Sequence, residues 1–371
     1  MATNKKIRVL IVDDSHFFRG VLSNGLRQDA RIEVVGTAAD AAEAKNKIRE
    51  LSPDVLTLDV EMPGMNGIDF LKQLMSTRPL PVVMVSSLDA RVFDILAAGA
   101  VDFVQKPKGG SEALQQFFTD LAAKILIASI ARLRLDRPTA TATATAPAPA
   151  PAPAPVPPGR REAEPGRRRP PPGGKGRNRI VLAFGASTGG TDALAEVLQR
   201  FPADTPGIIV TQHMPAGFTR MFAERLNRIC PMEVKEAENH DPIVPGRVLI
   251  APGGMQMGLE TGAAGYAVKV ISGEKVSGHC PSVDYLFTSV ARTAKKDAVG
   301  VIMTGMGGDG ADGLLLMRQA GAYTLGQDKD SCVVYGMPMV AMRKGAVCKE
   351  IALDTIAAEV LQHLRHRSGA R

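Results

Sequence analysis

The sequence contains no tryptophan, and aromatic residues make up only 4% of its 371 residues. Proteins that bind single-stranded nucleic acid stack bases on aromatic side chains, so this composition argues against such a partner. No apolar run approaches the roughly 18–20 residues that a membrane-spanning helix requires, and membrane insertion is not expected. The apolar residues 7–12 are followed at once by Asp13 and Asp14, so a secretory signal peptide is not expected either.

Cysteine is also scarce. The four cysteines show no CxxC pair and no other metal-ligating spacing: Cys230, Cys280, Cys332 and Cys348. We therefore expect reduced thiols in a cytoplasmic protein. Hydrophobic residues make up 45% of the chain, and its length suffices for two or three domains, each with a core.

The net charge of +7 is concentrated in one short segment. Residues 160–179 contain eight Lys or Arg and two Glu, and therefore carry +6 of that charge. This segment overlaps the end of an alanine- and proline-rich stretch, residues 138–178, which disfavours helix and sheet and lacks large apolar side chains. We interpret residues 138–178 as a semi-rigid linker, whose basic end either acts as a spacer or contacts an acidic surface. Nucleic acid is not an expected partner, because the basic residues do not form a folded face.

Short apolar runs alternate with segments of helical period on both sides of this linker. In the first half they are residues 7–12, 55–60, 82–87 and 101–105, and in the second half 180–185, 207–213, 299–305 and 322–326. Buried parallel strands have this composition. We expect two α/β domains, residues 1–137 and 179–371, each with an open, mostly parallel sheet covered by helices on both faces. Functional loops in such sheets lie at the carboxyl ends of the strands.

Polar residues of the first half fall at these strand ends. They are Asp13, Asp14, Asp59, Ser86 and Lys106. Three carboxylates brought together repel one another, and Mg²⁺ is the cation that suits such oxygen ligands. A metal beside one carboxylate favours transfer of a phosphoryl group to it, which Lys106 and the Ser86 hydroxyl could then hold. Asp14 taken alone could equally be a helix cap.

Over its whole length this half resembles the receiver domain of two-component response regulators, a doubly wound, flavodoxin-like fold. The match rests on the strand-end residues Asp13, Asp14, Asp59, Ser86 and Lys106-Pro107. The resemblance implies that Asp59 is the phospho-acceptor and that Mg²⁺ binds Asp13, Asp14, Asp59 and the carbonyl of Glu61. It also implies that Ser86 and Phe103 are a switch pair. The peptide bond before Pro107 is expected to be cis.

In the second half, residues 184–190 read FGASTGG between an apolar run and a helical segment. A phosphate-binding P-loop would need a lysine after its glycines, which is missing here. Residues 185–189 instead match GxSxG, the turn that presents a serine nucleophile between strand and helix. We expect the flanking glycines to permit the tight turn and to leave room for a substrate carbonyl. The following helix N-terminus offers free N–H groups for an oxyanion.

A serine nucleophile needs a base, and the base needs an orienting acid. His213 ends the run 207–213 and is therefore expected at the same sheet edge as Ser187. His240 is expected at the surface, and His279 could line a cleft. Asp309 is flanked by glycines after the run 299–305, which makes it the candidate acid.

The same glycines support a competing interpretation. Residues 308–313 read GDGADG, which fits GxGxxG after a strand and before a helix, and Asp328 lies near the spacing of a ribose-binding acid. A dinucleotide site is therefore an alternative, although it leaves Ser187 and His213 unexplained.

Four motifs of this half, in order, resemble the protein-glutamate methylesterase/protein-glutamine glutaminase family of chemotaxis. They are FGASTGGTDAL, TQHMPAGFT, HCPSVDYLF and MTGMGGDGADG. The resemblance covers residues 179–365 and implies Ser187 as nucleophile, His213 as base and Asp309 as orienting acid, with the N–H groups of Thr188 and Met306 as oxyanion donors. The order Ser, His, Asp differs from that of α/β-hydrolases.

The resemblance further implies a phosphorylation-activated hydrolase that needs no cofactor for hydrolysis. Its substrates would be glutamate γ-methyl esters and certain glutamines on chemoreceptor helices. Its phosphodonor would be a sensor histidine kinase, and the protein is expected to be a monomer. In that family the unphosphorylated receiver covers the catalytic cleft across a short linker, so the long linker here would loosen inhibition unless a direct interface compensates. A receiver joined to an inert, binding-only half is the alternative class.

Overall fold

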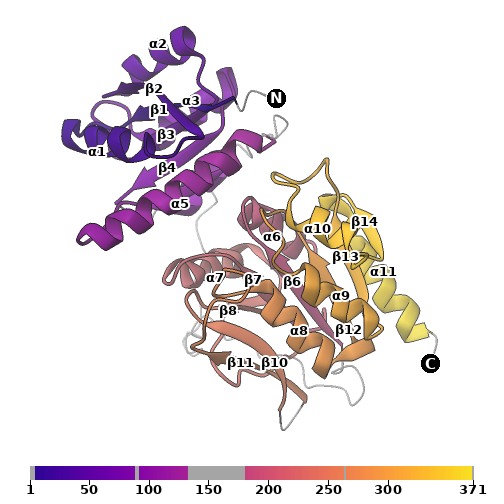
Figure 1. The fold of residues 1–371 in the computed structure, drawn as a ribbon. Coiled ribbons are helices and arrows are strands. Elements are labelled where there is room, and N and C mark those ends of the chain that lie inside the picture. The colour runs from indigo at the N-terminus through magenta and orange to yellow at the C-terminus, as the bar shows by residue number, and fades with distance from the viewer. Residues whose placement is uncertain (1–4, 88–91, 133–179, 263–264, 370–371) are drawn as a thin grey trace, which may run out of the picture.

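The computed structural model describes residues 5–87, 92–132, 180–262 and 265–369. The expected linker, residues 138–178, and the domain boundaries predicted beside it lie outside the described residues. The described parts form two α/β units, one before and one after that segment (Figure 1).

The N-terminal unit is built on one sheet of five parallel strands in the order β2-β1-β3-β4-β5. Its strands are β1 (Ile7–Val12), β2 (Ile32–Ala38), β3 (Val55–Asp59), β4 (Val82–Ser86) and β5 (Asp102–Gln105). Strands β3 and β4 are buried along their whole length, because helices cover both faces of the sheet. The order brings the carboxyl ends of β1 and β3 together, and it confirms the predicted fold class.

Five helices connect and cover these strands. They are α1 (His16–Leu26), α2 (Ala41–Leu51), α3 (Gly67–Thr77), α4 (Val92–Ala97) and α5 (Ser111–Ile130). The side chains of Ser15, Asp40 and Asn66 accept N–H groups in the first turns of α1, α2 and α3, which fixes where these helices begin.

Helix α5 has the length and apolar composition of a membrane-spanning helix, with 20 residues and a mean hydropathy of 1.2. The core helix of a globular domain passes the same test. Here Phe117, Leu121 and Ile125 are buried in one cluster with Val9 and Val83 of the sheet, so one face of α5 packs on the sheet of this unit.

The C-terminal unit contains a parallel sheet of seven strands in the order β14-β13-β12-β6-β7-β9-β8. Its strands are β6 (Val181–Ala186), β7 (Ile208–Gln212), β8 (Glu233–Glu236), β9 (Arg247–Ile250), β12 (Ala298–Ile302), β13 (Tyr323–Gln327) and β14 (Lys349–Ile351). Strands β7 to β9 lie on one side of β6 and β12 to β14 on the other, so the order in which strands are added reverses at β6. Ligands and catalytic groups collect at such a switch point.

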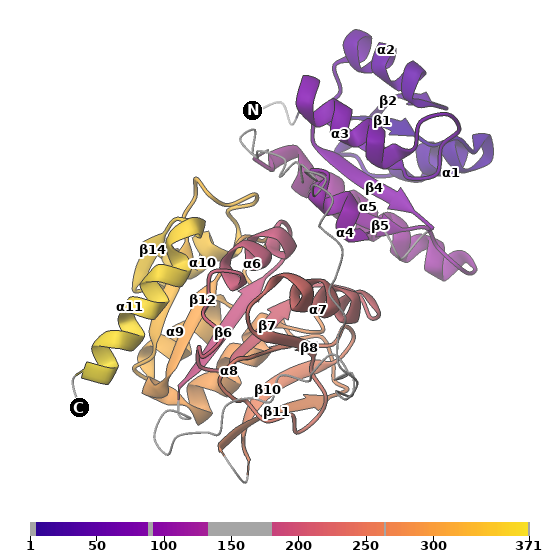
Figure 2. The ribbon, with the colours of Figure 1, turned by 180° about the vertical axis from the view of Figure 1, so that it is seen from behind.

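The surrounding helices are α6 (Gly190–Leu198), α7 (Phe218–Ile229), α8 (Val283–Thr293), α9 (Ala311–Gln319), α10 (Met337–Arg343) and α11 (Ile356–Gly369), with short 3₁₀ turns η1 (Lys295–Asp297) and η2 (Leu353–Thr355). A separate antiparallel hairpin, β10 (Gln256–Gly262) and β11 (Gly265–Ile271), was not predicted. It lies at the end of this unit that is remote from the N-terminal unit (Figure 1, Figure 2).

The prediction of a cis bond before Pro107 was wrong. Within the described residues the cis peptide bond is Cys280–Pro281, in the segment that leads into α8. All four cysteines are free thiols, as expected.

Candidate functional site

The nucleophile turn follows β6 directly, with Ser187 at its tip and α6 beginning at Gly190. Gly189 has φ 76°, in the left-handed region that favours glycine, and a Cβ there would lie 2.6 Å from Cβ of Val333. A Cβ on Gly190 would lie 2.2 Å from Oε1 of Gln212. The space beside these glycines is therefore filled by protein side chains. The expectation that the flanking glycines leave room for a substrate carbonyl stays a prediction.

Strand pairing brings Ser187 next to His213. Ala186 pairs with Gln212 in the parallel register of β6 and β7, and the His213 N–H donates to the Ala186 carbonyl at 3.1 Å. Nε2 of Gln212 donates to the Ser187 carbonyl at 2.8 Å and to the His213 carbonyl at 3.3 Å. The predicted nucleophile and base thus follow adjacent strands at one edge of the sheet.

The predicted acid is bonded to the same histidine. Nε2 of His213 lies 2.7 Å from Oδ2 of Asp309, and the two side chains are only 8% and 1% exposed. Asp309 also accepts hydrogen bonds from the Ser282 hydroxyl at 2.8 Å and from the N–H groups of Val283 and Asp284 at 2.8 and 2.9 Å. Burial raises the pKa of Asp309, but these bonds, that from His213 foremost, outweigh it and hold the pKa below its usual value.

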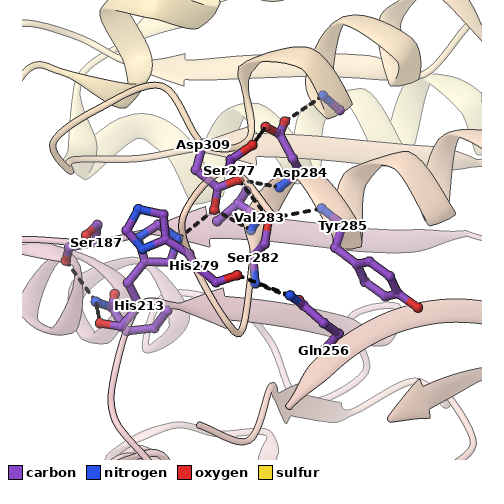
Figure 3. Close-up of polar contacts among 12 residues, drawn as sticks. Ser187, His213, Gln256, Ser277, His279, Ser282, Val283, Asp284, Tyr285 and Asp309 are labelled. Atoms are coloured by element: carbon purple, nitrogen blue, oxygen red, sulfur yellow. Dashed lines mark hydrogen bonds and ion pairs between the residues drawn. The ribbon is translucent and has the colours of Figure 1, made fainter. Parts of the chain in front are cut away.

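An ionised carboxylate only accepts hydrogen bonds, so Nε2 of His213 carries a hydrogen and donates it in the hydrogen bond to Asp309. Nδ1 is then the basic nitrogen. It is buried, and no hydrogen-bond partner for it exists among the described residues. Figure 3 shows Ser187 on the other side of the imidazole from Asp309. The arrangement leaves Nδ1 available to accept the serine proton.

The other histidines of this unit differ in their surroundings. The His240 side chain is 69% exposed and lies at the surface, as predicted, with Nδ1 2.6 Å from Glu260. His279 stacks on His213, with ring centroids 3.7 Å apart and planes 9° from parallel (Figure 3). The sequence suggested only that His279 could line a cleft.

The predicted oxyanion donors flank the serine. Gly305 lies so close that a Cβ there would be 2.7 Å from Cβ of Ser187, which places the next residue, Met306, beside the turn. Among the described residues, neither the Thr188 N–H nor the Met306 N–H has a hydrogen-bond partner. Their role as oxyanion donors stays a prediction.

The geometry around residues 308–313 disfavours a dinucleotide site. A pyrophosphate on that motif would need the free N–H groups at the start of α9. The Gly313 N–H instead donates to Oδ1 of Asp284 at 2.8 Å, and a Cβ on Gly310 would lie 2.4 Å from Val283. Asp309 points to His213 rather than outward, and Asp328 accepts from Ser331 in its own turn.

In the N-terminal unit the predicted acidic cluster is present. Carboxylate oxygens of Asp13, Asp14 and Asp59 all lie within 4.8 Å of one another. Nζ of Lys106 lies 2.8 Å from Asp13 and 2.6 Å from Asp59. Burial, followed by the charge of Asp13, raises the pKa of Asp59 against the opposing effect of Lys106. One ammonium leaves three carboxylates undercompensated, so the donor set fits a divalent cation of the Mg²⁺ type.

The remaining receiver candidates lie near this cluster. Ser86 ends β4 and is buried, and Phe103 lies on the neighbouring strand β5. Glu61 is exposed two residues after Asp59, and its N–H donates to Oδ1 of Asp59 at 3.4 Å. No contact here tests the carbonyl of Glu61 as a ligand or Ser86 and Phe103 as a switch, and both stay predictions.

Sequence reasoning missed the contacts that join the two units. The Thr188 hydroxyl donates to Oδ2 of Asp102 on β5 at 3.2 Å. The Phe103 ring packs on Phe218, the first residue of α7. The Arg132 N–H, just after α5, donates to the Val333 carbonyl at 2.9 Å. Thr188 and Phe103 were named for other roles, but no sequence signal predicted that they contact the other unit.

Comparison with known proteins places the chain in a family. Residues 182–360 match the family model "CheB methylesterase" and residues 9–117 match "Response regulator receiver domain". A Syntrophomonas wolfei relative named "Protein-glutamate methylesterase/protein-glutamine glutaminase 2" is 51% identical over 95% of this chain and 96% of its own length. The Escherichia coli K12 protein named "Protein-glutamate methylesterase/protein-glutamine glutaminase" is 44% identical over 96% of this chain and 96% of its own length.

Among solved structures, the catalytic domain of Thermotoga maritima CheB methylesterase aligns over 49% of this chain and 97% of its own, with 33% identity and a TM-score of 0.48. The two family models and the near full-length match to the relatives lead to one assignment: the chain belongs to the CheB methylesterase family, with a response regulator receiver domain ahead of the methylesterase domain.

Proposed function

We propose that this protein is a phosphorylation-activated hydrolase of the cytoplasm that removes methyl groups from glutamate γ-methyl esters on chemoreceptors, releasing methanol, and deamidates specific receptor glutamines. It would thereby serve sensory adaptation in a chemotaxis-type pathway. The names of its relatives support the substrate class. The observation that carries the chemistry is the 2.7 Å contact of His213 Nε2 with buried Asp309, which leaves Nδ1 of the same ring without a hydrogen-bond partner among the described residues.

The acylation step uses the three side chains in sequence. Nδ1 of His213 takes the proton from the Ser187 hydroxyl as its oxygen bonds to the substrate carbonyl carbon. Asp309, bonded to Nε2, stabilises the imidazolium that forms when Nδ1 is protonated, and the N–H groups of Thr188 and Met306 hold the oxyanion. The imidazolium then gives its proton to the leaving methoxide, so methanol departs and an acyl-serine remains.

Water completes the reaction on the same residues. His213 removes a proton from water as the hydroxide attacks the acyl carbon, and the proton passes to Oγ of Ser187 when the ester bond breaks. The product is a glutamate carboxylate. A glutamine follows the same course with ammonia as leaving group. The ester is the easier substrate, because an alkoxide leaves more readily than an amine.

The receiver supplies the regulation. An oxygen of Asp59 would bond to the phosphorus of a phosphohistidine on a sensor histidine kinase as the P–N bond breaks, and Lys106 and Ser86 would hold the new phosphoryl group. Asp13, Asp14 and Asp59, with the Glu61 carbonyl, would bind Mg²⁺. When bound, this ion neutralises charge on the phosphoryl oxygens.

The contacts between the units support inhibition by the unphosphorylated receiver. Asp102 binds Thr188, the residue after the nucleophile, at 3.2 Å. Phe103, the proposed switch residue, contacts Phe218, which begins the helix after the His213 loop. A direct interface of this kind offsets the low effective concentration that a long linker provides.

The test is methanol release from methylated receptor membranes by the full chain, with and without acetyl phosphate and Mg²⁺. We expect activity that rises with the phosphodonor and is lost in Ser187→Ala. Comparable methanol release by Ser187→Ala would reject Ser187 as the nucleophile. No release by the wild type under either condition would favour the binding-only alternative.

A further inference from the structure

Besides Asp309, His213 has a second close neighbour, and the proposed reaction gives this second residue no role. The imidazole of His279 lies flat on that of His213, with centroids 3.7 Å apart and planes 9° from parallel (Figure 3). His279 comes from a different part of the chain, between β11 and α8. The question is what effect the ring of His279 has on His213, the proposed catalytic base.

The backbone of His279 is fixed on both sides. Its N–H donates to the Val276 carbonyl at 2.9 Å, and its carbonyl accepts the Val276 N–H at 3.0 Å. The same carbonyl accepts Nε2 of Gln256 at 3.1 Å. Oε1 of Gln256 accepts the Ser282 N–H at 2.9 Å, and the Ser282 hydroxyl donates to Asp309. One network therefore holds both the acid beneath His213 and the ring stacked on it.

The ring of His279 has a different kind of contact. Among the described residues, its two nitrogens have no hydrogen-bond partner, so the ring is not held by polar bonds. Its main contact is the face of His213. A side chain anchored through its backbone, with its ring laid on another ring, acts on that ring's orientation.

The stacked ring also stays neutral. Burial above all, together with the charges of His213 and Lys275, lowers the pKa of His279 to about 4 against the opposing charge of Asp309. Of the two stacked rings, His213 is the one bonded to a carboxylate.

We propose that His279 is a positioning residue for the general base, acting through the stacked face of its ring. This inference rests on the proposed function. Bonded to Asp309 through Nε2 alone, His213 could tilt about that bond, and the stack keeps Nδ1 directed at Ser187. A neutral aromatic face also attracts a cation, so the stack strengthens when His213 becomes an imidazolium. Because that charge develops in the transition state, the contact raises kcat more than it lowers KM.

Three substitutions in the full chain, assayed with acetyl phosphate and Mg²⁺, test the proposal. His279→Ala removes the face, and we expect kcat to fall roughly 10- to 100-fold with little change in KM, the size of effect that misplacing a catalytic group produces. His279→Phe keeps an uncharged aromatic face and should retain kcat within about fivefold of the wild type. His279→Lys puts a cation beside His213, so kcat should fall and the acid limb of the kcat/KM profile should move to lower pH.

His240→Ala is the matched control, because that histidine is exposed and its carboxylate partner is Glu260 rather than Asp309. Ser187→Ala separates the two hypotheses: if it abolishes methanol release, the proposed function stands and the His279 variants test the stack alone. Thermal unfolding shows whether each variant is folded. The proposal is overturned if folded His279→Ala keeps kcat within twofold, if folded His279→Phe is as poor as His279→Ala, or if His279→Lys leaves the acid limb in place.

Discussion

Phe103 of the receiver sheet and Phe218 at the start of α7 pack with ring centroids 5.0 Å apart and planes inclined by 56°. Both side chains are buried. Phe103 lies on the strand beside Ser86, and Phe218 follows the loop that begins with His213. The pair thus joins β5 of the receiver to the start of α7 through one apolar contact.

Removing this contact should release the catalytic unit. Phe218→Ala loses a tilted aromatic pair, worth about 0.5–1.5 kcal/mol beyond its buried area. If the closed arrangement inhibits, basal methanol release should rise roughly tenfold and stimulation by acetyl phosphate should shrink. The matched control is Phe17→Ala, since Phe17 is 79% exposed on α1. An unchanged basal rate in folded Phe218→Ala would mean that this contact does not inhibit.

If Asp309 orients His213, replacing its carboxylate by an amide should lower kcat by changing which ring nitrogen of His213 carries the hydrogen. In Asp309→Asn the amide nitrogen can donate to Nε2, which moves the ring proton to Nδ1 and leaves no base for Ser187. We expect kcat to fall roughly 10³- to 10⁴-fold. Asp312→Asn, three residues later in the first turn of α9 and bonded to Lys344 at the surface, should stay near the wild type. Equal loss in both variants would assign the effect to folding instead.

Removal of divalent cations should affect the N-terminal unit and leave the hydrolytic activity of the C-terminal unit unchanged. With EDTA, acetyl phosphate should no longer label Asp59, because the carboxylates of Asp13, Asp14 and Asp59 would lack the cation that their cluster fits. Basal methanol release should not change, since the hydrolytic residues include no proposed metal ligand. Asp59→Asn should prevent labelling even with Mg²⁺. Labelling that survives in Asp59→Asn would move the phospho-acceptor to another residue.

Strand ends could be predicted from the sequence, because parallel strands are short apolar runs and their carboxyl ends meet at one edge. That reasoning placed Asp59 and Lys106 together and brought Ser187, His213 and Asp309 to one site. The hairpin β10–β11 was missed, since its strands mix Gly and charged residues with apolar ones.

Contacts between segments remote in sequence could not be predicted in the same way. The stack of His279 on His213 depends on the path of the chain between β11 and α8, which no periodicity encodes. The Phe103–Phe218 pair joins two units, and each ring alone is indistinguishable from a core residue. The glycines of the nucleophile turn were recognised, but the reason for them lies in the side chains that fill the space beside them.

Gly185 gives a quantitative test of that packing. It lies within β6, two residues before Ser187, and a Cβ there would meet Cγ1 of Val283 at 2.2 Å and the ring of Phe287 at 3.2 Å. Both neighbours are fully buried, so they cannot move aside freely. We expect Gly185→Ala to lower the free energy of unfolding by about 1–3 kcal/mol, as overpacking does in other cores. It should also impair catalysis, because Val283 donates its N–H to Asp309.

Gly20→Ala is the matched control in the same chain. Gly20 lies inside α1, and no atom comes within 4 Å of the position that its Cβ would take. Alanine there should raise the free energy of unfolding by roughly 0.5–1 kcal/mol, because glycine is the poorer helix former. Urea unfolding of both variants measures the difference, with the slope m used to check two-state behaviour. Stabilisation by Gly185→Ala comparable to that by Gly20→Ala would show that β6 and α8 are not packed as closely as the contact of Gly185 with Val283 requires.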